Sequence, residues 1–233
     1  MLVARKQHAT PDCEPAKQSL RLVMPTCLRH DAADQLHETQ VRIGADHWLE
    51  SAARLPSPNC DERTDPDDIV LLVVHNISLP PGRFGGEHVK QFFTNCLDCG
   101  ADEALADLEG VRVSAHLFVD RRGAITQFVR FDHRAWHAGQ SSYRGRSGCN
   151  DYSIGVELEG TDEASYEPIQ YQVLADIAAC LMRRYPRLSL SGIVGHQEIA
   201  PGRKTDPGAS FDWPRLYRDC LQRIGGARGA HRR

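Results

Sequence analysis

The sequence predicts an α/β fold in which a mixed central β-sheet is flanked by helices. Short apolar runs rich in β-branched residues indicate strands, and longer segments with apolar residues at helical spacing indicate helices. Two of the strands are joined by a tight turn, as in a hairpin. The polar residues with the most chemical potential stand at strand ends, where we expect the functional site.

The length of 233 residues suits one domain with a sizeable core and some additions. Residues 1–44 show scattered charge and no sustained period, so we interpret them as an extension, partly disordered, with a short helix near 31–40. Residues 45–224 form the main domain. The end, 225–233, is a glycine and arginine tail that we expect to be solvated.

Composition excludes several classes of protein. A net charge of −3 gives no basis for a nucleic-acid or anionic-membrane partner. No apolar stretch approaches the roughly 20 residues of a membrane helix, and the start lacks the apolar region of a secretory signal. The eight cysteines are irregularly spaced, which favours free thiols. We therefore expect a cytoplasmic monomer.

The first half of the main domain contains three predicted strands and a helix. The run 67–74 contains a continuous apolar stretch from Ile69 to Val74, as in a strand buried on both faces. The segment 87–97 has helical spacing, and its apolar face includes Cys96, which we expect to be a buried thiol without a metal. The segment 111–131 predicts two strands joined by a turn at Asp120 to Gly123.

The second half predicts a strand, a helix and a last strand. Residues 153–160 alternate, with Glu157 on the polar face. Residues 168–186 predict an amphipathic helix that begins at Pro168 and stops at Pro186. Its apolar stripe comprises Ile169, Val173, Leu174, Ile177, Leu181 and Met182. A short strand at about 190–194 leads into the glycine- and proline-rich loop 195–208.

Ionisable side chains follow or occupy these strands at equivalent places. His75 ends the strand 69–74, and His196 follows Ile193-Val194 after one glycine. Asp206 and Lys204 lie on the loop beyond His196. Because functional groups gather at strand ends in α/β sheets, these residues can converge with Glu157.

Two imidazoles and a carboxylate suit a catalytic zinc ion that leaves its fourth position to water. A carboxylate that is not a ligand must then take the proton of the water, and Glu157 is the candidate. Lys204 can stabilise an oxyanion. Taken singly, each residue also has an ordinary interpretation: a hydrogen-bonded structural histidine, a solvated strand face, a loop charge or a turn aspartate.

Five segments together resemble one family. They are VVHNISLPPGRFGG, RVSAHLFV, RAWHAG, CNDYSIGVELEGTD and GHQEIAPGRKTDPG with FDW after it, and they span about residues 45–220 in order. This pattern is similar to the AmpD family, the cytosolic 1,6-anhydro-N-acetylmuramyl-L-alanine amidases of Gram-negative bacteria. The resemblance implies a mixed sheet flanked by helices, as in phage lysozyme-type amidases and peptidoglycan recognition proteins.

The resemblance also implies roles for the same residues. The family's zinc ligands fall on His75, His196 and Asp206, its catalytic carboxylate on Glu157 and its intermediate-stabilising lysine on Lys204. The implied substrate is an anhydro-muropeptide from cell-wall turnover. The implied reaction cuts the amide bond between the lactyl group of the anhydro-muramic acid and L-alanine.

Substrate contacts implied by the resemblance are Asn76, Arg112, Trp136, His137, Ala138 and Gly139. Arg112, expected on the strand 111–119, matches an arginine that meets a peptide carboxylate, which a guanidinium can bind with two hydrogen bonds. Trp136 has the alternative of an aromatic core plug, and Arg112 that of a surface ion pair. Relatives commonly carry a basic residue where this chain has Gly148, so that role is lost or passes to Arg144 or Arg146.

Two other classes of function compete with a zinc hydrolase. A peptidoglycan-binding module would use the same fold without cleavage, but such modules typically lack one zinc ligand. A thiol amidase would use Cys149 with His137 or His133. A chelator separates the two enzymes, since only the zinc hydrolase would lose activity and recover it with zinc.

Overall fold

The computed structural model describes residues 41–229, and the side chains of residues 41–225. Residues 1–40 of the predicted extension, with its helix near 31–40, lie outside these residues. Residues 41–44 belong to the packed unit, because Ile43 forms a β-bridge with Leu49 and Val41 packs against the main core. None of the described helices is long and apolar enough to cross a membrane.

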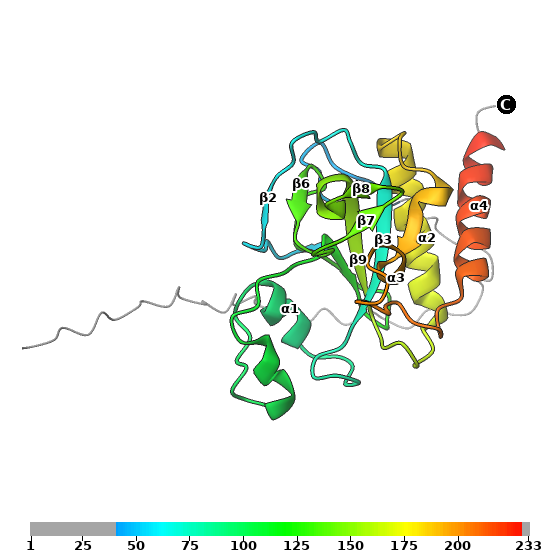
Figure 1. Cartoon of the computed structure of the whole chain (residues 1–233). Coiled ribbons are helices and arrows are strands. Elements are labelled where there is room, and N and C mark those ends of the chain that lie inside the picture. Colours follow the sequence, from blue (N-terminus) through cyan, green and yellow to red (C-terminus); the bar gives the residue numbers. More distant parts are fainter. Residues whose placement is uncertain (1–40, 230–233) are drawn as a thin grey trace, which may run out of the picture. The chain divides into compact units, whose positions relative to one another are not determined.

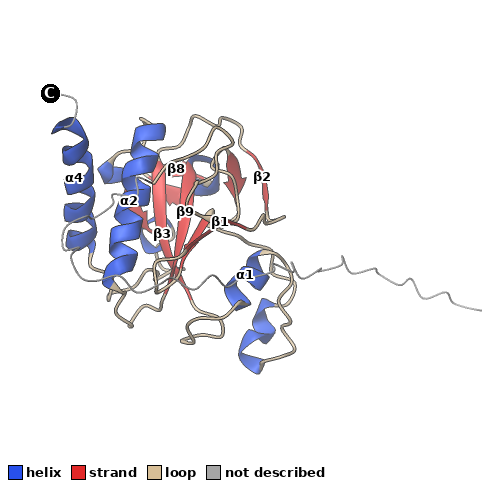
Figure 2. Ribbon diagram, turned by 180° about the vertical axis from the view of Figure 1, so that it is seen from behind, coloured by secondary structure: helices blue, strands red, loops and turns tan. Residues whose placement is uncertain are grey.

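A six-stranded mixed sheet forms the centre of the fold, as predicted (Figures 1 and 2). In spatial order its strands are β1 (Ala53–Arg54), β5 (Ile125–Gln127), β4 (Leu117–Val119), β9 (Ser153–Glu159), β3 (Leu71–Ile77) and β10 (Ile193–Gly195). Within this sheet, β4 and β5 are the one antiparallel pair, across the predicted turn. The other pairs are parallel.

Strand β3 differs from its prediction at both ends. It begins at Leu71 rather than 67, and it continues through His75 to Ile77 because its pairing with β9 extends to Ile77 opposite Glu159. The prediction that His75 ends the strand is therefore wrong, since β3 continues for two residues beyond it. Its backbone is held in the parallel ladder, which fixes the direction of its side chain.

Two long helices pack side by side over one face of the sheet (Figures 1 and 2). Helix α2 (Pro168–Arg184) confirms the prediction, with Pro168 in its first turn. Within its predicted stripe, Leu174, Ile177 and Leu181 are buried, whereas Ile169 is 38% exposed. Helix α4 (Trp213–Gly229) was not predicted, and it continues past the glycine at which the tail was expected to begin.

Short elements make up the rest of the described fold, and β2 with β6 and β7 with β8 form two small sheets. They are β2 (Cys60–Glu62), α1 (His88–Phe93), the 3-10 helix η1 (Glu103–Leu108), β6 (His133–Ala135), β7 (Ser142–Tyr143), β8 (Arg146–Ser147), η2 (Cys149–Tyr152), η3 (Leu190–Gly192) and α3 (His196–Ile199). Helix α1 is shorter than predicted, so Cys96 lies beyond it and is exposed, and the prediction of a buried thiol is wrong. Free thiols are present at Cys60, Cys99, Cys149, Cys180 and Cys220.

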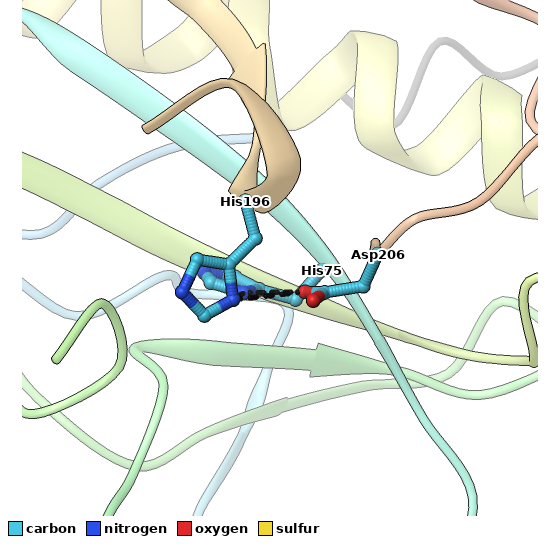
Figure 3. A group of neighbouring side chains, drawn as sticks. All are labelled: His75, His196 and Asp206. Atoms are coloured by element: carbon cyan, nitrogen blue, oxygen red, sulfur yellow. Dashed lines mark hydrogen bonds and ion pairs between the residues drawn. The ribbon is translucent and has the colours of Figure 1, made fainter. Parts of the chain in front are cut away.

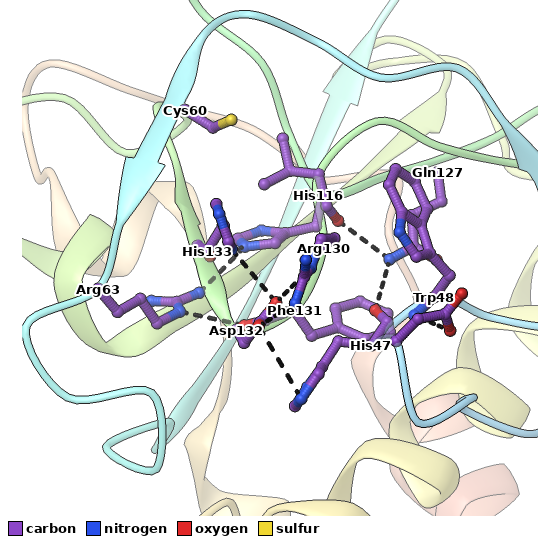
Figure 4. A network of polar contacts seen from close by, with 12 residues as sticks. His47, Trp48, Cys60, Arg63, His116, Gln127, Arg130, Phe131, Asp132 and His133 are labelled. Carbon is purple, nitrogen blue, oxygen red and sulfur yellow. Dashed lines mark hydrogen bonds and ion pairs between the residues drawn. The ribbon is translucent and has the colours of Figure 1, made fainter.

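The buried guanidinium of Arg63 holds several loops next to the sheet through hydrogen bonds (Figure 4). Arg63 is only 6% exposed, and it donates hydrogen bonds to the backbone carbonyls of Phe131, Asn150, Asp151 and Ser153. Burial lowers its pKa to about 10. By gathering these carbonyls, Arg63 fixes the segment that leads from η2 into β9, the strand that carries Glu157.

Candidate metal centre and cleft

Three ionisable side chains stand at the same level of three neighbouring strands. His75 of β3 pairs with Glu157 of β9, and His196 follows Gly195, which pairs with Val74. Because residues at paired positions of parallel strands point to the same face of a sheet, these side chains share one face. The sequence-based expectation that they converge is therefore met by the register of the strands.

Asp206 reaches this face from the loop after α3. The amide of Gln197 donates to the carbonyl oxygen of Asp206 at 3.1 Å, which ties the loop back to the start of α3. Gly208 has a φ of 84°, a conformation that favours glycine, and a Cβ there would lie 2.2 Å from the Cα of Asp162. The loop thus depends on a glycine to pass close to the segment after β9.

His75, His196 and Asp206 form a compact cluster (Figure 3). The Nδ1 atoms of the two histidines are 2.9 Å apart, and each lies 3.0 Å from Oδ2 of Asp206. A tetrahedral zinc ion with bonds of about 2.0 to 2.1 Å separates its ligands by roughly 3.3 Å. Small outward shifts of the side chains would therefore admit such an ion, so this donor set fits zinc.

The second nitrogen of each imidazole also has a partner. Nε2 of His196 donates to the carbonyl oxygen of Ala138 at 3.2 Å, and Nε2 of His75 lies 2.9 Å from Nδ1 of His137. A carbonyl can only accept, so a neutral His196 keeps a lone pair on Nδ1. Histidines that bind metals typically hold their other nitrogen in this way.

Burial decides the charge of the cluster. It lowers the pKa of His75 to about 4, although the neighbouring Asp206 opposes this shift, so this imidazole is neutral near pH 7. Burial alone would raise the pKa of Asp206, but the neighbouring His196 and His75 bring it below its usual range. A neutral imidazole at His75 and a carboxylate at Asp206 are the protonation states that a divalent cation requires of these two ligands.

Glu157 has a different environment from Asp206. Burial, and then the negative charge of Asp206, raise its pKa well above the usual range, while Lys204 opposes the rise. Its Oε2 atom is buried and has no hydrogen-bond partner within the described part of the chain. Such a carboxyl is typical of a group that exchanges protons.

A cleft of about 1140 Å³ opens beside the cluster. Its lining includes the cluster itself and seven other residues chosen from the sequence: Asn76, Arg112, Trp136, His137, Gly139, Glu157 and Lys204. Ala138 is wholly buried and does not line it, so a side-chain contact of Ala138 with substrate is not supported. Arg112 lines the cleft from an exposed position before β4, not from the predicted strand.

Some residues of the site were not identified from the sequence. Asn150 accepts hydrogen bonds from the amides of His137 and Ala138 through Oδ1, and Asp162 accepts one from Nδ2 of Asn76 at 2.8 Å. Arg203 donates to the carbonyl oxygen of Ala138 at 2.8 Å. Asn150 and Asp162 stand in segments already singled out, but their partners are distant in sequence, so no local signal reveals these roles.

The geometry does not support the thiol alternative. Cys149 is fully buried and its Sγ lies 3.2 Å from the hydroxyl of Tyr152. It does not line the cleft, and Nε2 of His137 is directed to Ser153 instead. Cys149 is a structural thiol.

Gly148 also has a structural role, as a left-handed residue with φ of 75° before η2. Arg146 does not replace a basic side chain there, because it pairs with Asp68 and stacks over Tyr152. Neither Arg144 nor Arg146 lines the cleft. Arg112, which precedes β4 in the sequence, does line the cleft and offers a guanidinium there.

Comparison with known proteins is consistent with this geometry. The model of the N-acetylmuramoyl-L-alanine amidase family (Amidase_2) matches residues 65–209, which include every member of the cluster. The chain is 54% identical over 169 residues to the 1,6-anhydro-N-acetylmuramyl-L-alanine amidase AmpD of Citrobacter freundii, covering 72% of this chain and 90% of that protein. It is 52% identical to AmpD of Escherichia coli K12, covering 72% and 92%.

Solved structures agree with the sequence comparison. A crystal structure of a selenomethionine AmpD derivative is 52% identical, with a TM-score of 0.73, over 75% of this chain and 97% of that one. The part of this chain without a counterpart there is therefore about a quarter of its length.

Proposed function

The chain belongs to the N-acetylmuramoyl-L-alanine amidase family, and from this premise we propose that it is a zinc amidase of peptidoglycan recycling. Its substrate is an anhydro-muropeptide. The bond that it hydrolyses joins 1,6-anhydro-N-acetylmuramic acid to the L-alanine of the stem peptide, as the names of its AmpD relatives indicate. The chain covers about nine-tenths of those relatives, so the proposal concerns the whole enzyme.

The observation that carries the proposal is the cluster of three donors about 3 Å apart on one face of the sheet. His75, His196 and Asp206 would hold zinc. A zinc ion in such a site supplies a polarised carbonyl and an activated water at neutral pH. Because three protein donors converge among the described residues, a tetrahedral ion held by them would have one position left for water.

Glu157 would act as the general base and then as the general acid. Its raised pKa suits a group that takes a proton from the attacking water and gives it to the leaving nitrogen of L-alanine. Its unpartnered Oε2 provides the acceptor for the first of these transfers. The transfer to nitrogen makes the amine a neutral leaving group, so the C–N bond can break.

Lys204 would stabilise the negative charge that develops on the carbonyl oxygen. It lines the cleft, and its charge is close enough to shift the pKa values of both His75 and Glu157. An ammonium placed at a developing oxyanion lowers the barrier more than it stabilises the substrate.

The substrate would lie along the cleft between charged and apolar walls. Arg112 provides a guanidinium for a peptide carboxylate, and Asn76, held by Asp162, offers an amide beside the cluster. Trp136 and Gly139 border the same space. We place the reaction in the cytoplasm, where anhydro-muropeptides from wall turnover are recovered.

The test is product analysis with a defined anhydro-muropeptide. We expect mass spectrometry to detect the free peptide and the free anhydro-sugar, with the reaction stopped by a chelator and restored by zinc. Binding without cleavage would favour a recognition module instead. Cleavage that resists chelation would remove zinc from the mechanism.

A further inference from the structure

His137 was expected to contact substrate, but its ring nitrogens are both directed into the protein. Nδ1 lies 2.9 Å from Nε2 of His75, and Nε2 lies 3.0 Å from Oγ of Ser153. The ring of His137 stands edge-on to that of His75, with centroids 5.1 Å apart. Its polar atoms are therefore occupied by protein groups, although the side chain borders the cleft.

The direction of these hydrogen bonds follows from Ser153, the last residue of the hydrogen-bonded series. Ser153 donates its single hydroxyl proton to the carbonyl oxygen of Cys149 at 2.5 Å. Ser153 Oγ must then accept from Nε2 of His137, which leaves Nδ1 of a neutral His137 as an acceptor. Nε2 of His75 donates to it, so Nδ1 of His75 keeps its lone pair toward His196 and Asp206.

Two observations support a dedicated site for this ring. Gly155 of β9 makes room for the ring, because a Cβ at that position would lie 2.5 Å from Cγ of His137. Asn150 fixes the backbone amide of His137 at 3.1 Å.

We propose that His137 and Ser153 are positioning residues that set the tautomer and orientation of His75 for zinc. The inference rests on the proposed function, because it concerns the ligand set of the same ion. Partners of this kind typically change metal affinity by roughly 10- to 100-fold when they are removed. His137 thus acts through His75 and not through a contact with substrate.

The test compares three variants of the full chain. His137→Leu removes the acceptor and leaves Nε2 of His75 without a partner. His137→Asn keeps an acceptor oxygen near the place of Nδ1. Ser153→Ala removes only the hydroxyl that accepts from Nε2 of His137. His88→Ala, on helix α1 and outside the cleft lining, is the control.

Zinc affinity is measured on zinc-free protein by competition with a chromophoric chelator. We expect His137→Leu to weaken it roughly 10- to 100-fold, Ser153→Ala to weaken it less, and His137→Asn to stay close to the wild type. Denaturant unfolding of the zinc-free proteins checks that each variant folds. Should His137→Leu fail to fold, the contrast between Ser153→Ala and His137→Asn carries the test.

A second measurement does not need zinc. Ring-nitrogen chemical shifts in NMR spectra of the zinc-free protein report which nitrogen of His75 carries the proton, and we expect Nε2 in the wild type and a mixture in His137→Leu. Unchanged zinc affinity with a raised KM in His137→Leu would overturn the inference and make His137 a substrate contact. A wild-type chain that binds no zinc is a different result, since it would overturn the proposed function itself.

Discussion

Glu157 lies beside His75 at the same level of the sheet, but it does not join the cluster of His75, His196 and Asp206. The two carboxyl groups have opposite shifts in pKa, because the neighbouring imidazoles lower the pKa of Asp206 while burial raises that of Glu157. At the scale of single residues, this difference separates a ligand from a proton carrier.

The separation predicts different defects for two substitutions. Glu157→Gln keeps the shape of the side chain but cannot carry a proton, so we expect the variant to bind as much zinc as the wild type and to lose turnover by about 100- to 10,000-fold. Asp206→Ala removes the only anionic donor, so we expect it to lose the metal. Metal analysis and turnover of the purified variants check both. A zinc-free Glu157→Gln protein would contradict the role given to Glu157.

At the scale of elements, the loop that carries Lys204 and Asp206 is shaped by two glycines in the same left-handed conformation. Gly202 has φ of 75° and open space where a Cβ would stand, whereas a Cβ on Gly208 would meet the backbone of Asp162 at 2.2 Å. At either position an alanine would have to adopt the unfavourable left-handed backbone conformation. The steric conflict belongs to Gly208 alone.

Alanine at these two positions is therefore a matched pair. We expect Gly202→Ala to cost about 1 to 2 kcal/mol of stability and to leave zinc affinity unchanged. Gly208→Ala should cost about 3 kcal/mol or more and weaken zinc binding, because the backbone next to Asp206 must move. Denaturant unfolding and chelator competition measure the two effects. Equal zinc affinity in the two variants would mean that the loop does not position Asp206.

Helix α2 allows a similar comparison within one predicted apolar stripe. Leu174 is fully buried in the main core and Ile169 is 38% exposed. We expect Leu174→Ala to lower the free energy of unfolding by about 2 to 5 kcal/mol and Ile169→Ala by about 1 kcal/mol. Chemical denaturation of the two variants checks the difference. Similar losses would place Ile169 in the core as the sequence pattern suggested.

The same helices show which features a sequence pattern can predict. Helix α2 was predictable because Pro168 and Pro186 bound a clear apolar period. Helix α4 could not be predicted, because the glycines and arginines in its last turns are not typical of a helix. It is held instead by tertiary packing against α2. The cluster was predicted through strand-end chemistry and family resemblance. The hydrogen bonds of His137, Asn150 and Asp162 could not be predicted, since they join residues that only the fold brings together.

At the scale of the whole molecule, His75 and the main core lie on opposite faces of the sheet, because Leu72 and Val74 of β3 pack into the core and His75 points the other way. The core between the sheet and the helices α2 and α4 is apolar, and a second apolar cluster packs under α1. Neither of these apolar regions contains His75, His196 or Asp206. The described fold thus has its own source of stability, and we expect the zinc-free chain to stay folded.

Zinc should nevertheless stabilise the folded state, because the three donors converge only after folding brings β3, the start of α3 and the loop after it together. At free zinc about 100 times its dissociation constant, linkage gives about 2.7 kcal/mol, which corresponds to a rise in Tm of roughly 5 to 10 °C. Thermal unfolding with zinc and with chelator measures the rise. His75→Ala is the control, since it should abolish the rise while the zinc-free variant still unfolds cooperatively. A wild-type chain that unfolds when zinc is withdrawn would show instead that the metal holds the fold together, and a Tm unaffected by zinc would show that no such site forms.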